Sequence, residues 1–318
     1  MSDFVAFPID SEEYFIVSKH RLEKQHEEYQ YLHLIEDVIT NGYSQTDRTG
    51  VGTFTKIGSQ MRFSLRNETL PVYTTRRTFF RGAVEELLWI LRGETNVKSL
   101  QEKNIHIWDG NTNSVFIKKR GLEGVVPENS VGTLYGFQFR NWNGNWEQWR
   151  DNNIRTGVDQ LAKIVNLISN DPNSRRILSS NYNVSQTETG VLEPCHTLYS
   201  FNVDTVKKEI HSLLWMRSCD LLCGNPLNVL HISILTHILA KMFGYNAGDF
   251  VFQASNTHVY KNHIKDAMEQ IKRIPYKFPK IQIKKDIKTI RDIESLTYED
   301  FELKDYMCHP PIKYEMAI

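Results

Sequence analysis

The sequence predicts a single α+β domain, on three observations. Segments with helical and with strand periodicity alternate without a regular βαβ order, several predicted strands follow one another directly, and no repeat or low-complexity linker divides the 318 residues. A chain of this length can bury a sizeable core in one domain. Residues 1–28 carry many charges, so we expect a polar N-terminal extension there and the folded domain at 29–318.

Each element follows from its local pattern. Apolar residues three and four apart predict helices over 29–40, 79–92 and 158–169, and Pro226 is a typical first residue of a further helix. Alternating or β-branched runs predict strands over 54–65, 176–183, 197–204, 209–216, 250–254 and 280–284. The stretch 110–134 is long for a loop, which indicates an insertion near a functional edge.

The most apolar stretch, 227–243, begins at this predicted helix. Polar residues interrupt it, including Asn228, His231 and His237, so it is interpreted as a buried helix and not a membrane span. The first residues lack a basic segment followed by a long apolar core, and we therefore expect no secretory signal.

Charge and cysteine content narrow the class of protein. Thirty-eight basic side chains balance 38 acidic ones, so any anion site must be local and no general attraction to DNA or a membrane surface is expected. Cys195, Cys219, Cys223 and Cys308 show no disulfide spacing, and Cys219 and Cys223 lack the second ligand pair of a zinc site. We expect a reducing, cytoplasmic location and no metal.

Cys195 is the candidate nucleophile. It lies between Pro194 and His196, just ahead of the predicted strand 197–204. Proline fixes the backbone before the thiol, and histidine can take part in proton transfer beside it. Taken alone, however, an intracellular cysteine is more often a small buried hydrophobic residue.

Arginines at the ends of predicted elements indicate a phosphate site. Arg48, Arg175, Arg176 and Arg217 all occupy such positions, and Ser218 follows the last of them. Guanidinium groups bind phosphate through paired hydrogen bonds, and a hydroxyl adds another donor. Spacing alone also allows them to be ordinary surface arginines.

Glu86 is a candidate general acid or base. On the predicted helix, Arg81, Glu85 and Arg92 share a polar stripe, whereas Glu86 falls within the apolar arc. Burial raises the pKa of a carboxyl group toward neutrality, which suits proton transfer. A buried glutamate with a purely structural role is equally compatible with this helix.

Two further features point to a nucleotide. Asn228 lies inside an otherwise apolar helix, and a buried carboxamide can pair with the N–H and C=O of an imide. His258 and Tyr260 alternate onto one side of an extended segment, where both can bind a sugar hydroxyl, although such residues are also common at strand ends.

These residues belong to motifs that resemble the thymidylate synthase family over nearly the whole chain, from about residue 29 to 318. The motifs are DRTGVGT at 47–53, EELLW at 85–89, IWD at 107–109, LYGFQ at 134–138, SRR at 174–176, PCH at 194–196, RSCD at 217–220, THVYKNH at 257–263, and the C-terminal HPPIK and MAI. The resemblance implies a mixed, twisted sheet packed with helices, and a sheet face that forms a dimer interface.

The resemblance also implies reductive methylation of dUMP to dTMP, with 5,10-methylenetetrahydrofolate as donor of one carbon and a hydride and no metal. Cys195 would add to C6 of the pyrimidine. Glu86 would handle protons through water, Tyr135 would assist loss of the C5 proton with His196 in support, and Asn228 would hold the uracil edge.

The remaining implied contacts divide between the two ligands. The nucleotide would be bound by Arg48, Arg217, Ser218, Asp220, Asn228, His258 and Tyr260, with Arg175 and Arg176 donated by the partner of a homodimer. These arginines would also lower the pKa of the thiol. The folate would contact Phe79, Ile107, Trp108, Asp220, Gly224, Leu227, Met316 and Ala317.

Several positions depart from the family pattern. They are Arg76, Thr133, Glu193, Ser200, Met216, Leu227 and Asn256, where the family usually has Lys, Pro, a small or apolar residue, Gln, Gln, Phe and Asp. None of them removes a group assigned to catalysis.

The sequence leaves three alternative functions to be considered. A hydroxymethylase of dUMP, or less readily of dCMP, would use the same thiol and folate but end the reaction with water. A non-catalytic nucleotide- or RNA-binding protein would not need Cys195, Glu86 and Tyr135 together. A cysteine hydrolase would need an Asn or Asp that orients the base, and none is identified.

Overall fold

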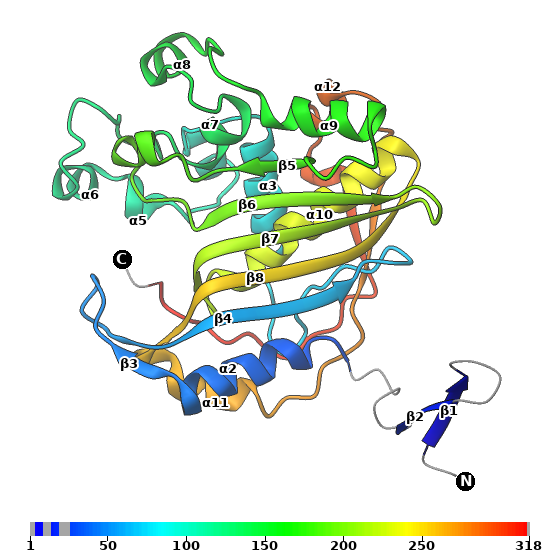
Figure 1. The fold of residues 1–318 in the computed structure, drawn as a ribbon. Coiled ribbons are helices and arrows are strands. Elements are labelled where there is room, and N and C mark those ends of the chain that lie inside the picture. Colours follow the sequence, from blue (N-terminus) through cyan, green and yellow to red (C-terminus); the bar gives the residue numbers. More distant parts are fainter. Residues whose placement is uncertain (1–3, 9–13, 19–25, 317–318) are drawn as a thin grey trace.

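A six-stranded mixed sheet forms the centre of the computed structural model, which describes residues 4–8, 14–18 and 26–316 (Figure 1). Its strands are β3 (Tyr43–Gln45), β4 (Thr53–Ser64), β5 (Leu178–Ser180), β6 (His196–Asp204), β7 (Glu209–Asp220) and β8 (Asn246–Tyr260), in the order β3-β4-β8-β7-β6-β5. Strands β7 and β8 are parallel, and the other neighbours are antiparallel. The predicted α+β class is confirmed.

Two small antiparallel pairs complete the strands. They are β1 (Phe4–Pro8) with β2 (Tyr14–Ser18), and β9 (Lys280–Ile283) with β10 (Phe301–Lys304). The largest difference from the sequence prediction is β8, which is 15 residues long and not limited to 250–254. Its ends contain poor strand formers such as Gly248 and Asn256, but pairing with β4 on one side and β7 on the other outweighs local preference.

Four long helices accompany the sheet: α2 (Tyr29–Asn41), α3 (Phe80–Leu91), α9 (Gln160–Asn170) and α10 (Asn225–Phe243). Each agrees with a predicted helix to within about two residues. The shorter helices are α4 (Lys98–Gln101), α5 (Asp109–Thr112), α6 (Ser114–Lys119), α7 (Tyr135–Arg140), α8 (Trp146–Asn152), α11 (Ile264–Gln270) and α12 (Ile290–Glu294); the 3₁₀ turns are η1 (Val184–Thr189), η2 (Lys261–His263) and η3 (Tyr298–Asp300).

The stretch 110–134 is not simply a loop, as the sequence suggested, because it contains most of α5 and all of α6. The Asn113 side chain accepts a hydrogen bond from the Phe116 amide at 2.9 Å and caps α6, while Phe116 and Ile117 are buried. Helices of one or two turns depend on such caps and contacts, and they are too short to show a periodic pattern.

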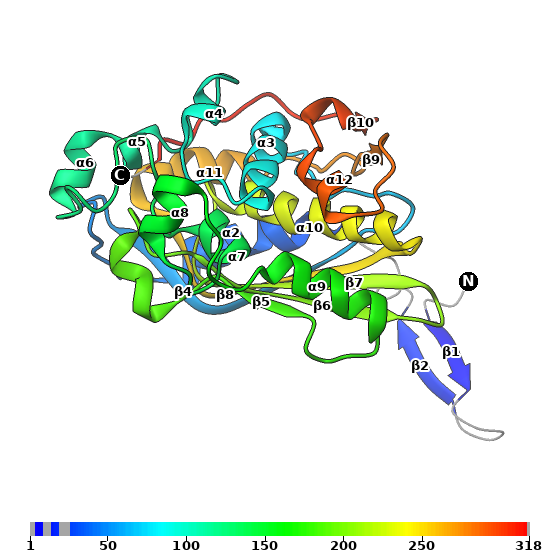
Figure 2. The same cartoon turned by 90° about the horizontal axis from the view of Figure 1, so that it is seen from above.

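Helix α10 is the core helix of the domain. It connects the parallel strands β7 and β8 and packs against both of them and against α3 (Figure 2). Among the described residues it is the one helix long and apolar enough to cross a membrane, but most of it is buried inside the fold. The prediction of a buried helix at this position is confirmed.

One detail of the prediction for helix α3 is wrong. Glu85 is expected on an exposed polar stripe of the helix, but in the structure it is buried like its neighbour Glu86. Lys103 explains the difference, because its Nζ donates to Glu85 Oε2 at 2.6 Å and provides a counter-charge from the chain just beyond α4.

The helices lie on one face of the sheet, and no helix in the part of the chain that the structure describes lies over the other face (Figure 2). On this open face Trp215 of β7 lies between its cross-strand neighbours Leu198 of β6 and Gln253 of β8. Leu178 of β5 lies beside Ser200 of β6. Trp215 is 36% exposed and Leu178 is 40% exposed. Exposed apolar side chains grouped on a flat face are typical of a protein interface.

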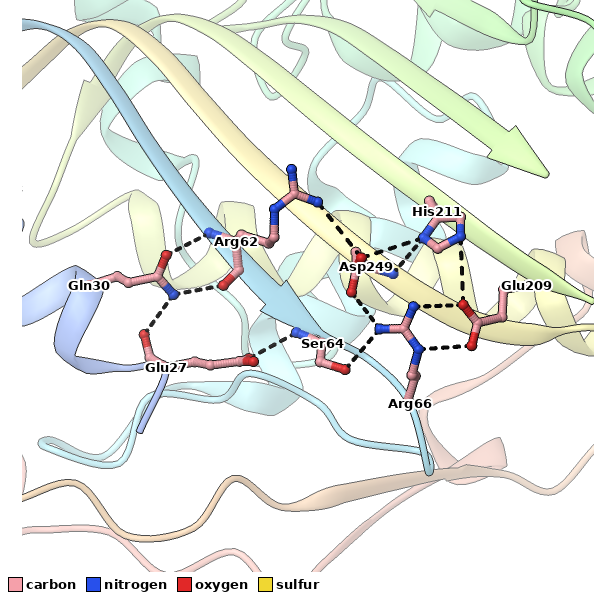
Figure 3. Close-up of polar contacts among 8 residues, drawn as sticks. All are labelled: Glu27, Gln30, Arg62, Ser64, Arg66, Glu209, His211 and Asp249. Carbon is pink, nitrogen blue, oxygen red and sulfur yellow. Dashed lines mark hydrogen bonds and ion pairs between the residues drawn. The ribbon is translucent and has the colours of Figure 1, made fainter. Parts of the chain in front are cut away.

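A polar cluster joins three strands at one end of the sheet (Figure 3). Arg66 lies between two carboxylates: it donates to both oxygens of Glu209, at 2.8 and 2.6 Å, and to Asp249 Oδ1 at 2.6 Å. Its hydrogen bonds hold the pKa of Glu209 below the usual value. Arg66 follows β4, Glu209 begins β7, and Asp249 lies in β8, so the cluster fixes the relative positions of the strands that carry the candidate site at their other ends.

Candidate active site

The candidate site lies at the carboxyl ends of the parallel strands β7 and β8, with the N-terminus of α10 beside them. Crevices at this position are common ligand sites in sheets with parallel strands. A hollow of about 350 Å³ is present here, and residues predicted to bind a phosphorylated sugar line it: Arg48, Arg217, Ser218, His258 and Tyr260. Segments that are far apart in the sequence therefore meet at one place.

A tight loop between β3 and β4 holds Arg48 at the rim of the hollow. Asp47 organises the loop, accepting hydrogen bonds from the Thr49 hydroxyl at 2.5 Å and the Gly52 amide at 2.9 Å. Gly50 and Gly52 both have φ of +79°, a conformation that side chains with a Cβ disfavour. Arg48 itself is exposed, so its guanidinium is available to a ligand.

Arg217 fixes the backbone around Cys195. Its Nε donates to the Pro194 carbonyl at 3.0 Å and its Nη2 to the Glu193 carbonyl at 2.9 Å, while its amide donates to the Cys195 carbonyl at 3.1 Å. The pairing register of β6 with β7 shifts between His196 and Leu198, directly after the cysteine. Such bulges redirect side chains near active sites.

Cys195 is half-buried, and two opposing influences act on its thiol. Burial raises its pKa above the usual value, whereas the charges of Arg217 and Arg48 lower it and that of Asp220 raises it. The two arginines thus lower the pKa of the thiol, but desolvation of the thiolate outweighs them and the pKa lies above the usual value.

Tyr135 contacts the candidate nucleophile directly. The Cys195 amide donates to the Tyr135 hydroxyl oxygen at 3.0 Å. Burial, and then the negative charge of the nearby thiolate, hold the pKa of Tyr135 well above 10, so the phenol remains protonated near neutral pH. Its O–H can therefore act as a donor or relay a proton, but not as a preformed phenolate base.

His196 lies behind Cys195 and is buried. Its Nδ1 is 2.9 Å from the Tyr199 hydroxyl. Burial lowers the pKa of His196 to about 4, and the nearby His231 acts in the same direction. The ring is thus neutral at physiological pH and can support a hydrogen-bond network, but it does not carry a charge.

Glu86 projects from α3 toward the same region and is buried. Trp108 Nε1 donates to Glu86 Oε1 at 2.9 Å, and His231 Nε2 lies 3.3 Å from Oε2. His231 is not among the site residues predicted from the sequence, in which it is one of several polar residues that interrupt the apolar stretch. Its position three residues after Asn228 places the two side chains on one side of α10.

Asn228 lies in the first turn of α10 and is half-buried. Its Nδ2 is 3.5 Å from the sulfur of Met216, a weak acceptor. Met216 is one of the departures from the family pattern. A side chain at Gly224 would place its Cβ 3.4 Å from the Asn228 amide nitrogen, so glycine leaves room beside it.

His258 is oriented by Asn256, another departure. Its Nδ1 is 2.9 Å from Asn256 Oδ1, an arrangement that places a proton on Nδ1 and leaves Nε2 as an acceptor. Burial lowers the pKa of His258, opposed by Asp220 and Asp47. The neutral ring can therefore accept a hydrogen bond from a hydroxyl in the hollow. Tyr260 packs edge-on against His258, with ring centroids 5.3 Å apart.

The residues predicted to contact folate are only partly brought together. Ile107, Trp108 and Leu227 are half-buried, and Asp220 Oδ1 accepts hydrogen bonds from the Leu222 and Cys223 amides and so shapes the turn that leads to Gly224. Phe79 instead lines a second hollow of about 520 Å³ with Arg77, Arg81 and Tyr306.

The C-terminal segment lies near this turn. The Glu315 carbonyl is 2.8 Å from His263 Nε2, and the Cys223 thiol is 3.8 Å from the Tyr314 carbonyl. Met316, the next residue, is 52% exposed. Ala317, also predicted to contact folate, lies outside the described residues.

Arg175 and Arg176 are not among the residues that line the hollow. They are exposed and immediately precede β5, the strand at the edge of the sheet opposite β3. Within one chain, therefore, two of the four predicted phosphate arginines meet at the site and two do not.

Comparison with known proteins gives a consistent result. The sequence model of the family described as thymidylate synthase matches residues 29–318. The bifunctional dihydrofolate reductase-thymidylate synthase of Leishmania amazonensis is 43% identical over 295 residues, which cover 93% of this chain and 56% of that protein. The protein of the same description from Zea mays is 42% identical over 294 residues (92% and 55%). The probable thymidylate synthase of Schizosaccharomyces pombe is 40% identical over 298 residues (92% and 48%). The chain spans about half the length of these curated relatives.

Proposed function

The chain belongs to the thymidylate synthase family, and we propose that it converts dUMP to dTMP with 5,10-methylenetetrahydrofolate, which leaves as dihydrofolate. The observation that carries the proposal is the gathering of Arg48, Arg217, Ser218, His258 and Tyr260 around one hollow. Arg217 also bonds to the Pro194 and Cys195 carbonyls and so connects the hollow to the candidate nucleophile. Such a set suits a phosphorylated sugar attached to a base that a thiol can attack.

The nucleotide contacts follow from the donors available. Arg48 and Arg217 with the Ser218 hydroxyl would bind the 5′-phosphate, and Asp220 would help to position the nucleotide. His258 Nε2 and the Tyr260 hydroxyl would bind the sugar hydroxyl. Asn228 would pair with the imide edge of uracil, donating to one carbonyl and accepting from N3–H.

The chemistry begins with the thiolate of Cys195. Its sulfur forms a bond to C6, and the electron pair of the C5–C6 double bond moves toward C5 and the O4 carbonyl. Glu86 would supply a proton toward that oxygen through water, and C5 becomes nucleophilic. Tyr135, with His196 behind it, would assist the later loss of the C5 proton, and elimination of the thiolate restores the ring and frees Cys195.

The folate co-substrate supplies the one-carbon unit and the hydride. Ile107, Trp108, Gly224 and Leu227 offer half-buried, largely apolar surface suited to its ring system, with Asp220 as a polar contact. The C-terminal segment ending at Met316 and Ala317 would cover it. Phe79 lies in the separate hollow beside Arg77 and Arg81, where an extended anionic part of the folate could reach.

One assay tests the proposed reaction. The protein with dUMP and methylenetetrahydrofolate should form dTMP and dihydrofolate in equal amounts, measured by chromatography and by dihydrofolate absorbance. Without folate neither product should appear. Formation of hydroxymethyl-dUMP without dihydrofolate would show that water ends the reaction in place of hydride, and the protein would then be a hydroxymethylase.

We also propose a homodimer in which the open sheet face is the interface. The exposed Trp215 and Leu178 on that face support it, as does the position of Arg175 and Arg176 beside the edge strand β5. The two arginines would reach the phosphate of the partner's site. The four free cysteines fit a reducing, cytoplasmic location.

Subunit mixing tests the shared site. The double variant Arg175→Ala, Arg176→Ala and the variant Cys195→Ala should each be nearly inactive as purified. After dissociation and random reassociation, about half of the dimers contain one chain of each kind and one intact site, which restores about a quarter of wild-type activity. If mixing restores nothing while the dimers do exchange, the arginines act within their own chain or not at all.

A further inference from the structure

We propose that His231 is a positioning residue that acts through Glu86, and that the two side chains share one proton used in the reaction. The inference rests on the proposed function and assigns a role to a residue that neither the motifs nor the proposed mechanism uses. The structure points to it through burial, distance and the partners of each atom in the pair.

The geometry isolates the pair from other groups. His231 Nε2 lies 3.3 Å from Glu86 Oε2, and both residues are buried, with 4% and 8% of their surface exposed. Trp108 occupies the other carboxylate oxygen, Oε1, at 2.9 Å. In the described part of the chain neither ring nitrogen of His231 has a hydrogen-bond partner of good geometry, so Glu86 is the polar group that it faces.

Burial makes this contact energetically significant. A carboxylate removed from water is costly unless donors or a positive charge compensate it. The Trp108 indole supplies one neutral donor, and His231 is the group at the second oxygen. An imidazole and a carboxyl group in contact can pass a proton between them, so one proton can lie on either partner.

The other titratable groups around the pair do not supply a charge or a mobile proton near neutral pH. His196 and Tyr199 on β6 and Tyr135 on α7 face the same region. Burial lowers the pKa of His196 to about 4 and raises those of Tyr135 and Tyr199 far above neutrality, so near neutral pH these three groups are uncharged. The His231–Glu86 contact is the remaining pair of polar groups in this region that can exchange a proton.

Helix geometry connects the pair to the base-reading residue. His231 follows Asn228 by three positions on α10, so their side chains lie on the same side of the helix, one turn apart. A proton that leaves Glu86 therefore does so beside the group proposed to hold the uracil edge. α10 also packs against α3, which fixes the distance between the two partners.

Before the addition, one proton lies between Glu86 Oε2 and His231 Nε2. When Cys195 adds to C6, this proton passes from Glu86 through water toward O4 of the base, and a carboxylate beside a neutral histidine remains. Loss of the C5 proton and release of product return one proton to the pair by the same route. His231 thus keeps Glu86 able to donate without touching the substrate.

The test compares two histidines on one helix. His231→Gln keeps a polar side chain but cannot take up a proton. We expect kcat to fall by about tenfold to hundredfold, with KM for dUMP changed less than about threefold. The pH profile of kcat should also differ from that of the wild-type protein. His237→Gln is the matched control, because His237 is buried on α10 but bonds to the Thr69 carbonyl at 3.0 Å; it should keep the wild-type pH profile.

A double-variant cycle separates positioning from simple loss of structure. In a Glu86→Gln background, His231→Gln should lower kcat by less than about threefold, since the pair is already broken. His231→Asn serves as a second variant if glutamine does not fit. An unchanged pH profile in a folded His231 variant, or a full additional loss in the Glu86→Gln background, overturns the inference. Absence of dTMP formation by the wild-type protein would instead reject the proposed function.

Discussion

Replacing Cys195 with alanine should lower turnover of dUMP by roughly 10⁴-fold or more, because the covalent step has no substitute nucleophile. The structure supports a direct role: the thiol lies where Arg217 holds the two preceding carbonyls and where Tyr135 accepts a hydrogen bond from the Cys195 amide. The measurement is intact-mass spectrometry with 5-fluoro-dUMP and methylenetetrahydrofolate. Wild type should gain one nucleotide and one folate per chain, and the variant should gain neither.

Cys308→Ala provides the control for the adduct experiment. Cys308 is a free cysteine outside the candidate site, and its loss should leave turnover within about twofold of wild type and the adduct intact. An adduct that survives in Cys195→Ala would assign the nucleophile to another cysteine. Cys219 is a poor candidate, because its burial raises the pKa of the thiol well above the ordinary value.

Asn228→Asp should change the base that the site prefers. An amide donates to one carbonyl of uracil and accepts from N3–H, whereas a carboxyl group can accept from the C4 amino group of cytosine. A site that hydrogen-bonds its substrate rejects a mismatched one strongly, since buried polar groups lose their partners. The ratio of kcat/KM for dUMP to that for dCMP should therefore fall by about a hundredfold or more, measured as nucleotide product from each substrate.

The comparison variant for this experiment is Asn228→Ala. It removes the amide without creating a new preference, so it should weaken dUMP turnover and leave dCMP as poor a substrate as before. If Asn228→Asp keeps the wild-type discrimination, the base is recognised by other groups. The neighbouring Met216 would then be the first to examine, because it contacts the amide nitrogen.

The elements that the sequence predicted well are those with a strong local signal. The apolar periodicity of α2 and α3 and the alternation in β4 all correspond to observed elements. What could not be predicted depends on contacts distant in sequence. Strand β8 extends over residues with low strand preference because two neighbours pair with it, and Glu85 is buried because Lys103 reaches it.

The candidate site shows the same division. Cys195 and Asn228 can be predicted as candidates from their unusual neighbours in sequence, and both are half-buried in the structure. His231 was missed because α10 is apolar on all sides, so a single histidine there has no polar face to mark it. Only the fold brings Glu86 to it from α3. The role of Arg175 and Arg176 cannot be derived from one chain, since the phosphate that they are proposed to bind lies in the site of a second chain.

The parallel pair β7 and β8, joined by α10, has a consequence for how specificity can change. Arg217, Ser218, Asn228, His231, His258 and Tyr260 all belong to residues 209–260, one continuous segment of chain. In the proposed function, the groups that bind the base and the sugar therefore lie in a single block, whereas the nucleophile, its tyrosine and the phosphate-binding Arg48 come from outside it. Exchange of this block between related enzymes should transfer substrate preference while the attacking group stays the same.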